Sequence, residues 1–110
     1  MTRQTMEYAV EATVTEADTY TLGIFVSYEG EEAGLNISVW GDAEWSATVT
    51  LERRFSSTGT WMAVKQYTYA DAVEHSIQEQ LADWEKAAQY RIGVAAGDYS
   101  SGTINLRLGR

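Results

Sequence analysis

Apolar and polar residues alternate along much of the chain, and a period of two indicates half-buried β-strands. In residues 6–14, the positions expected to face inward share one side of the strand: Met6, Tyr8, Val10, Ala12 and Val14. Glu7 and Glu11 fall on the opposite side. Residues 20–28 repeat the pattern and predict a second strand, whose inward positions are Leu22, Ile24 and Val26.

Two pairs of later stretches predict β-hairpins. The first pair is residues 35–40 and 45–51, which alternate and are separated by a Gly-Asp-Ala-Glu turn sequence. The second pair is residues 90–94 and 103–108, joined by a glycine-containing loop that begins at Gly97. If both predictions hold, the partners of each pair lie side by side in one sheet.

The middle of the chain is less regular. The alternation fails at Arg53, which falls on the inward parity of its strand. We therefore expect the strand to bulge there or to leave the core. Residues 61–69 are strand-like in composition but not cleanly periodic.

One segment follows a different period. Its apolar residues are spaced four, four, three and four positions apart, which is a helical stripe: Val73, Ile77, Leu81, Trp84 and Ala88. No glycine or proline interrupts residues 70–89, and Asp71 is placed to cap a helix. The pattern predicts one short helix at about residues 71–88, with an extended segment as the alternative.

These elements predict a mainly β protein. Seven or eight short strands at this spacing are typical of an antiparallel β-sandwich or jelly roll. Strands and helices do not alternate, so a parallel α/β sheet is not expected. We interpret residues 1–110 as a single domain, in which residues 1–5 form a flexible N-terminal arm.

The net charge of the chain and its distribution indicate which classes of partner it can bind. The formal net charge is −8, and ten acidic residues but no basic one lie between Gln4 and Arg53. Binding to nucleic acid depends on neutralising phosphates, so we expect none. The acidic half suits an electropositive protein partner or is simply a solvated face. The chain has no cysteine and no apolar run long enough to span a membrane, so neither thiolate chemistry nor membrane binding is expected.

The sequence offers little catalytic chemistry. His75 is the only histidine, and its position four residues after Asp71 predicts a surface helix pair. Glu29, Glu31 and Glu32 flank a glycine but lack the spacing of a calcium loop, which favours a solvated acidic loop. We expect no cofactor, no metal and no enzyme activity.

The aromatic residues are better candidates for a functional role, which would be binding. The chain has four tryptophans and seven tyrosines. Trp40 and Trp45 flank a predicted turn, and Trp40 lies opposite in parity to Leu35, Ile37 and Val39. An exposed tryptophan there would be a platform for a sugar ring or an anchor for a protein. The alternative is a core residue on a strand that is covered on both faces.

Several short segments resemble a group of small virion structural proteins of tailed bacteriophages. The matching stretches are residues 35–69 and 90–108, about half of the chain, and the segments within them that carry the resemblance are 35–39, 47–55, 59–61, 90–94 and 97–103. The resemblance implies a β-sandwich or jelly-roll subunit bound to a viral particle that assembles in the cytoplasm of a bacterial host. In such proteins the segment before Tyr90 is shorter and extended, whereas here it has a helical pattern.

Two classes of function are therefore expected. The first is a capsid decoration (cement) protein that binds the major capsid protein or other virion proteins as an oligomer, most simply a trimer. The expected partner-binding residues are Arg3, Met6, Trp40, Trp45, Arg53 and Arg54. The second is a carbohydrate-binding module of a fibre, resting on Trp40 and Trp45. A head–tail adaptor or neck component is a further virion position.

Overall fold

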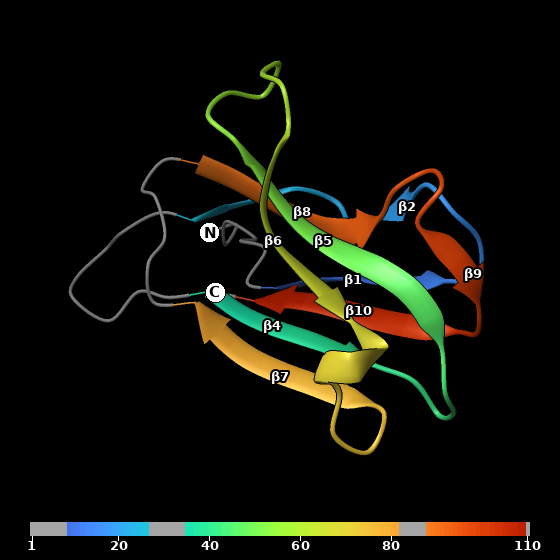
Figure 1. Cartoon of the computed structure of the whole chain (residues 1–110). Helices are drawn as coiled ribbons and strands as arrows, with labels where there is room; N and C mark the ends of the chain where they lie inside the picture. Colours follow the sequence, from blue (N-terminus) through green and yellow to red (C-terminus); the bar gives the residue numbers. More distant parts are fainter. Residues whose placement is uncertain (1–8, 27–34, 82–87, 110) are drawn as a thin grey trace, which may run out of the picture.

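The computed structural model describes residues 9–26, 35–81 and 88–109, and they form two packed antiparallel sheets (Figure 1). The four-stranded sheet has the order β1 (Ala9–Val14), β10 (Ile104–Gly109), β4 (Leu35–Trp40) and β7 (Ser76–Leu81). The six-stranded sheet has the order β2 (Thr19–Tyr20), β8 (Ala88–Val94), β5 (Ser46–Arg54) and β6 (Met62–Thr68). In addition, β3 (Ile24–Val26) pairs with β8, and β9 (Tyr99–Ser101) pairs with β5.

The strand order is that of a jelly roll. Both β2 and β3 pair with β8, and both β8 and β9 pair with β5, so each of these two couples acts as one interrupted strand. Counted in this way, the two sheets run 1-8-3-6 and 2-7-4-5. Jelly rolls of this kind form viral capsid and lectin domains. The predicted antiparallel β-sandwich or jelly roll is confirmed.

The core lies between the two sheets and consists of the side chains that alternate inward. The four-stranded sheet contributes Val10, Val14, Leu35, Ile37, Val39, Ile77, Ile104, Leu106 and Leu108. The six-stranded sheet contributes Ile24, Val49, Leu51, Tyr67, Ala88, Tyr90, Ile92 and Val94. The inward parity predicted for Val10, Val14 and Ile24 is therefore confirmed, whereas Met6 and Tyr8 lie outside the described residues.

Both predicted hairpins are wrong. Strand β4 pairs with β10 and β7, whereas β5 belongs to the other sheet. Likewise, β8 and β10 lie in different sheets, and β9 and its following turn carry the chain across. A polar, glycine-containing connection reverses the chain equally well within one sheet or between two. Alternation shows which side of a strand is buried, but it does not show which neighbour the strand takes.

The prediction that Leu22 faces inward is also wrong, because its side chain is 78% exposed. The strand is interrupted after Tyr20, and the buried Thr21 breaks the period of two. The Thr21 hydroxyl accepts a hydrogen bond from the Ile92 N–H at 3.1 Å, and the Thr21 N–H donates to the Ile92 carbonyl at 2.9 Å. Inward parity resumes at Ile24, three residues later.

The helix predicted at 71–88 is wrong as well. In its described part the chain forms a short 3₁₀ turn, η1 (Tyr69–Asp71), and then strand β7, which pairs with β4 along its whole length. Glu74 and His75 both have positive φ, so the chain reverses tightly between Val73 and Ser76. Ile77 and Leu81 satisfy a period of two as well as a period of four, and Val73 is 76% exposed. Residues 82–87 lie outside the described part.

Candidate functional site

Two arginines and two aromatic rings interleave on the outer face of the six-stranded sheet. The Arg91 guanidinium carbon lies 3.8 Å from the centre of the Tyr20 ring and 4.4 Å from the centre of the Trp61 ring. The Arg54 guanidinium carbon lies 4.3 Å from the Trp61 ring. The order is therefore Tyr20, Arg91, Trp61 and Arg54, which we call the Arg–aromatic stack. Each contact is within the range of a cation–π interaction.

Hydrogen bonds fix both guanidinium groups of the stack. The Arg91 Nε–H donates to Glu52 Oε1 at 2.8 Å, and the Arg54 Nε–H donates to Gln89 Oε1 at 2.7 Å. The Arg91 and Glu52 side chains are only 24% and 16% exposed. Such charge-assisted bonds hold a planar group in one orientation while its two faces contact the rings. The stack is therefore ordered before any partner binds.

The sheet places these groups by strand parity. On β8 the outward residues are Gln89, Arg91 and Gly93, and on β5 they include Glu52 and Arg54. Gly93 has no side chain, and the Tyr20 ring occupies the space above it. The β5–β6 register shifts opposite Leu51 and Glu52 because β6 carries one extra residue, Val64, whereas β5 keeps its register with β8 through Arg54, so the bulge predicted at Arg53 lies on the neighbouring strand instead. Trp61 directly precedes β6. Burial and the Glu52 carboxylate raise the pKa of Tyr20, so its hydroxyl stays neutral at physiological pH.

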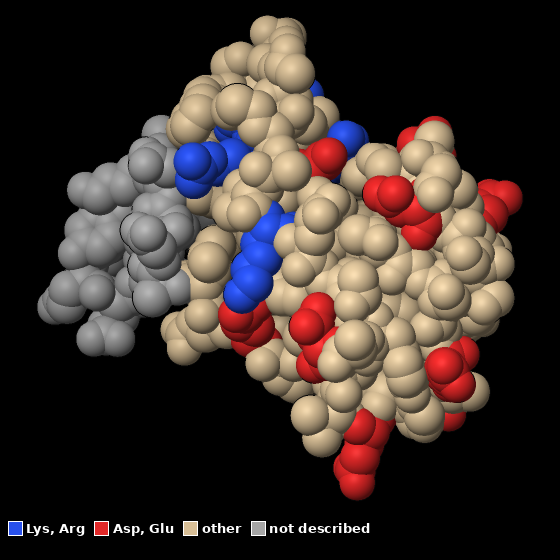
Figure 2. Space-filling view, viewed as in Figure 1, with Lys and Arg blue, Asp and Glu red and all other residues tan. Residues whose placement is uncertain are grey.

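Basic residues concentrate on one of the two sheets. Of the five Lys and Arg residues that the structure describes, four lie on β5, β6 and β8: Arg53, Arg54, Lys65 and Arg91. Arg54 and Arg91 belong to the stack, whereas Arg53 pairs with the buried Tyr90 and Lys65 with the buried Leu51, so these two fall on the inward parity of their strands. Figure 2 shows basic groups on one side of the molecule, with acidic groups beside them and along the opposite margin. Phe55 beneath the Arg53 guanidinium is 54% exposed, and Met62 is 44% exposed, so uncovered apolar area lies beside Arg53.

The structure brings together only part of the predicted binding set. Arg54 lies in the stack, whereas Arg53 has the opposite parity on the same strand and lies over the Phe55 ring. Trp40 is half-buried on the outer face of the opposite sheet. Trp45 is 1% exposed, so its predicted role as a sugar platform or anchor is wrong. Arg3 and Met6, like the acidic loop at 29–32, lie outside the described residues.

The sequence interpretation missed Tyr20, Trp61 and Arg91. Alternation along β8 places Arg91 outward, which was a usable signal. Its neighbours come from segments about 70 and 30 residues away, and only the strand order brings them together.

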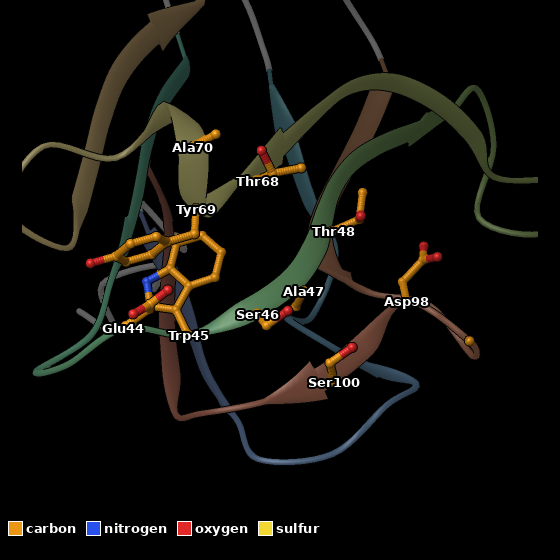
Figure 3. A pocket seen from close by; sticks show the side chains of 11 residues that line it. Glu44, Trp45, Ser46, Ala47, Thr48, Thr68, Tyr69, Ala70, Asp98 and Ser100 are labelled. Carbon is orange, nitrogen blue, oxygen red and sulfur yellow. The ribbon is translucent and has the colours of Figure 1, made fainter.

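A shallow pocket of about 460 Å³ lies where β5 begins (Figure 3). Figure 3 shows the Trp45 and Tyr69 rings at one end and Asp98 and Ser100 at the other. The remaining polar lining consists of Glu44, Ser46, Thr48 and Thr68. The His75 ring is not part of this lining. No pairing of a hydroxyl nucleophile with a base is seen along the lining, and the described residues hold no cluster of three metal-ligating side chains.

The predicted Asp71–His75 pair is wrong. The His75 Nδ1 atom contacts the Tyr69 hydroxyl, and the two rings stack at 5.8 Å. Asp71 instead accepts a hydrogen bond from the Thr68 N–H at 2.9 Å, which caps the η1 turn. Without a helix, residues 71 and 75 no longer share a face.

A second polar cluster joins the open edges of the two sheets. The Tyr67 hydroxyl on β6 donates to Glu79 Oε1 on β7 at 2.5 Å, and Lys65 Nζ donates to Glu79 Oε2 at 2.6 Å. These bonds, first that from Lys65 and then that from Tyr67, lower the pKa of Glu79. Burial and the Glu79 hydrogen bond raise the pKa of Tyr67. The cluster therefore favours a charged Glu79 and a neutral Tyr67.

We predict that Tyr67→Phe lowers the free energy of unfolding by about 1–2 kcal/mol at neutral pH, because it removes a bond to a charged acceptor. The folded-state pKa of Glu79 lies below its ordinary value of 4.5, so its contribution exists above that pH and is lost as pH falls through the folded-state pKa. The effect of Tyr67→Phe should therefore shrink in acid. Urea denaturation at neutral pH and at about pH 3 measures the difference.

The matched control is Tyr99→Phe. The Tyr99 hydroxyl donates to the Gly102 carbonyl at 2.6 Å, which does not titrate. Its loss should be the same at both pH values. If the effect of Tyr67→Phe did not shrink in acid either, the charge of Glu79 would not be its source.

Comparisons with protein-family models, with curated proteins and with solved structures found no match. Within residues 9–26, 35–81 and 88–109, no helix is long and apolar enough to cross a membrane.

Proposed function

We propose that the protein is a virion structural protein of a tailed bacteriophage that binds the major capsid protein as a decoration (cement) protein. The Arg–aromatic stack is the observation that carries its role in binding. The jelly-roll order of the strands and the phage-like sequence words support the viral setting.

The composition of the stack suits a protein interface. Tryptophan, tyrosine and arginine dominate the residues that lose most affinity when truncated to alanine. The side chains are already held by Glu52 and Gln89, so little rotamer entropy remains to be lost on binding. Exposed Phe55 and Met62 add apolar area beside the cations. An acidic partner surface with an apolar recess would complement it.

The proposed role is binding, without enzyme activity. No hydrogen bond joins a hydroxyl to a carboxylate along the lining of the pocket at the start of β5, and His75 contacts Tyr69 instead. The formal net charge of −8 disfavours binding to nucleic acid, because sixteen acidic residues outnumber eight basic ones.

We propose a trimer as the assembled form, located on the head surface in virions assembled in the host cytoplasm. Native mass spectrometry of the purified protein measures this directly. A ring of many copies would instead indicate a head–tail adaptor and overturn the proposed position. Immunogold labelling found only on the tail would do the same.

The central test is Trp61→Ala in a binding assay with purified heads that lack the protein. Trp61 contacts both arginines, so its loss removes two contacts of the stack at once. We expect the dissociation constant for the heads to rise about 30-fold, equivalent to about 2 kcal/mol. Co-sedimentation of labelled protein with the heads measures it.

Trp40→Ala is the matched control, because Trp40 is also half-buried but lies on the other sheet. It should bind the heads as tightly as the natural sequence does. Equal affinities of Trp61→Ala and the natural sequence would refute the role of the stack. Failure of the natural sequence to bind heads at all would refute the decoration function.

A further inference from the structure

The outer face of the four-stranded sheet is mainly a grid of uncharged polar side chains, to which Trp40 and Arg107 add one aromatic ring and one cation. The strands β4, β7 and β10 present outward Asn36, Ser38, Trp40, Ser76, Gln78, Gln80, Asn105 and Arg107. Hydrogen bonds cross the strands within this grid. Ser38 Oγ–H donates to Gln78 Oε1 at 2.8 Å, and Gln78 Nε2–H donates to Ser76 Oγ at 3.0 Å. The polar groups are therefore held in fixed orientations.

Two shallow depressions lie on this grid and share part of their lining. One, of about 440 Å³, contains Trp40, Gly41, Glu74 and Ser76, and the other, of about 350 Å³, contains Asn36, Glu79 and Gln80. Both are lined by Ser38, Gln78 and Arg107. The shared residues make them one groove, which we call the polar groove. From Trp40 to Asn36 it follows β4 for about 13 Å, at roughly 3.4 Å per residue.

The chemistry of the polar groove fits a ligand rich in hydroxyl groups. Each hydroxyl both donates and accepts, and the groove offers amides and hydroxyls that do both. Trp40 supplies an apolar ring at one end, which suits the C–H face of a sugar. A few placed polar groups beside an aromatic ring are the usual means of orienting a small ligand.

Charge and apolar area argue against other ligands. Arg107 lies 3.8 Å from Glu11, and Glu74 and Glu79 also line the groove. These carboxylates balance the positive charge of Arg107, which disfavours binding of phosphate groups and nucleic acid. Apart from Ile37, which is 1% exposed, Trp40 is the one large apolar side chain among the lining residues, whereas a protein interface normally has a cluster of them.

From these observations we infer that the polar groove binds a neutral oligosaccharide chain, with Trp40 contacting one sugar ring and Gln78 and Arg107 contacting hydroxyl groups. The groove is longer than one residue of such a chain requires, so affinity should rise with chain length. This site is separate from the Arg–aromatic stack, which lies on the opposite sheet. The two proposals can therefore succeed or fail independently.

The experiment is a titration of the isotope-labelled protein, followed by amide NMR shifts, with maltohexaose, cellohexaose, chitohexaose and mannohexaose, each to about 10 mM. At least one hexasaccharide should produce saturable shifts at β4, β7 and β10. Trp40→Ala should weaken that binding about tenfold or more, and Gln78→Ala, an exposed site, should weaken it without affecting the fold. The corresponding disaccharide should bind more weakly than the hexasaccharide.

Trp61→Ala is the control and should leave the sugar affinity unchanged. The inference is overturned if none of the four hexasaccharides produces saturable shifts, or if the shifts lie at the pocket beside Trp45 or at the Arg–aromatic stack. It is also overturned if both Trp40→Ala and Gln78→Ala bind as the natural sequence does. Binding of heads that depends on Trp61, without any sugar binding, would leave the decoration function standing alone.

Discussion

Replacing Trp45 by alanine should lower the free energy of unfolding by about 3–5 kcal/mol, the range for large aromatic residues truncated in a core. Trp45 is 1% exposed and stands where several connections meet. The Tyr69 ring meets it edge-on at 5.2 Å, and its Nε1–H points at the His75 carbonyl at 3.5 Å. Its removal would leave a cavity among loops from both sheets.

Two glycines show how closely the chain surrounds this ring. A Cβ at Gly102, which has a φ of +95°, would lie 2.7 Å from the Trp45 Cβ, and one at Gly41 would lie 2.9 Å from Cδ1. Backbone on both sides approaches so closely that the site has little room to collapse around alanine. The cost of Trp45→Ala should therefore fall in the upper part of the range.

The measurement is urea or thermal denaturation followed by far-ultraviolet circular dichroism. A domain of this size loses about 4–8 °C of Tm per kcal/mol, so the shift should exceed roughly 12 °C. Trp40→Ala is the control, since Trp40 is half-buried on an outer face, and it should lose much less. A loss for Trp45→Ala no larger than that of the control would contradict a core role.

This result also bears on how a sugar-binding role would be tested. Both tryptophans looked equivalent in the sequence because each flanks the same turn. Loss of binding in Trp45→Ala would reflect unfolding, whereas loss in Trp40→Ala would reflect a contact. The distinction requires the three-dimensional structure, because the turn after β4 crosses between sheets and carries Trp45 inward.

The sequence predicted the buried faces well because alternation is a local property. Leu35, Ile37 and Val39 are buried as their parity indicated. Strand pairing is not local, so both hairpin predictions failed although the strands themselves were correct. Polar, glycine-containing loops connect β4 to β5 across the sandwich and β5 to β6 within one sheet.

The segment at 76–81 shows where two local signals conflict. Ile77 and Leu81 are spaced four apart, which suits a helix, but they also suit alternate positions of a strand. The free edge of β4 offered six backbone positions for pairing, and the positive φ of Glu74 and His75 turned the chain onto it. Tertiary pairing therefore outweighed local helix preference.

The Arg–aromatic stack was the least predictable part of the structure. Arg53 and Arg54 were among the predicted binding residues. The side chains that contact Arg54 are Gln89 on β8 and Trp61, which directly precedes β6. No pattern in the sequence relates Tyr20 to Arg91 or Arg91 to Trp61. Such a stack forms only when the jelly-roll order places three separate segments on one face.

Gly93 should be the position at which this face is most sensitive to a small change. A Cβ there would lie 2.3 Å from Cδ2 of Tyr20 and 2.4 Å from the Thr19 carbonyl oxygen. The second atom belongs to the backbone of β2 and cannot move aside by a rotamer change. We expect Gly93→Val to lower the free energy of unfolding by about 3 kcal/mol, the upper range for overpacking.

The same substitution should dismantle one end of the stack. Displacing Tyr20 removes the ring on one side of the Arg91 guanidinium, while the bond from Arg91 to Glu52 is left in place. Denaturation measures the stability, and hydrogen exchange of the Thr21 amide, which donates to the Ile92 carbonyl, reports whether the chain after β2 has separated from β8.

Gly109→Val provides the matched control, because Gly109 also lies in a strand but the three atoms nearest to a Cβ there all belong to the Arg107 guanidinium, the first at 3.1 Å. That long side chain can move, so the control should lose little stability. Equal losses at the two glycines would mean that the general cost of adding a side chain, and not the approach of Tyr20, explains the effect. A loss confined to Gly93, with faster exchange of the Thr21 amide, would show that a missing side chain on β8 is what allows an aromatic ring to cover Arg91.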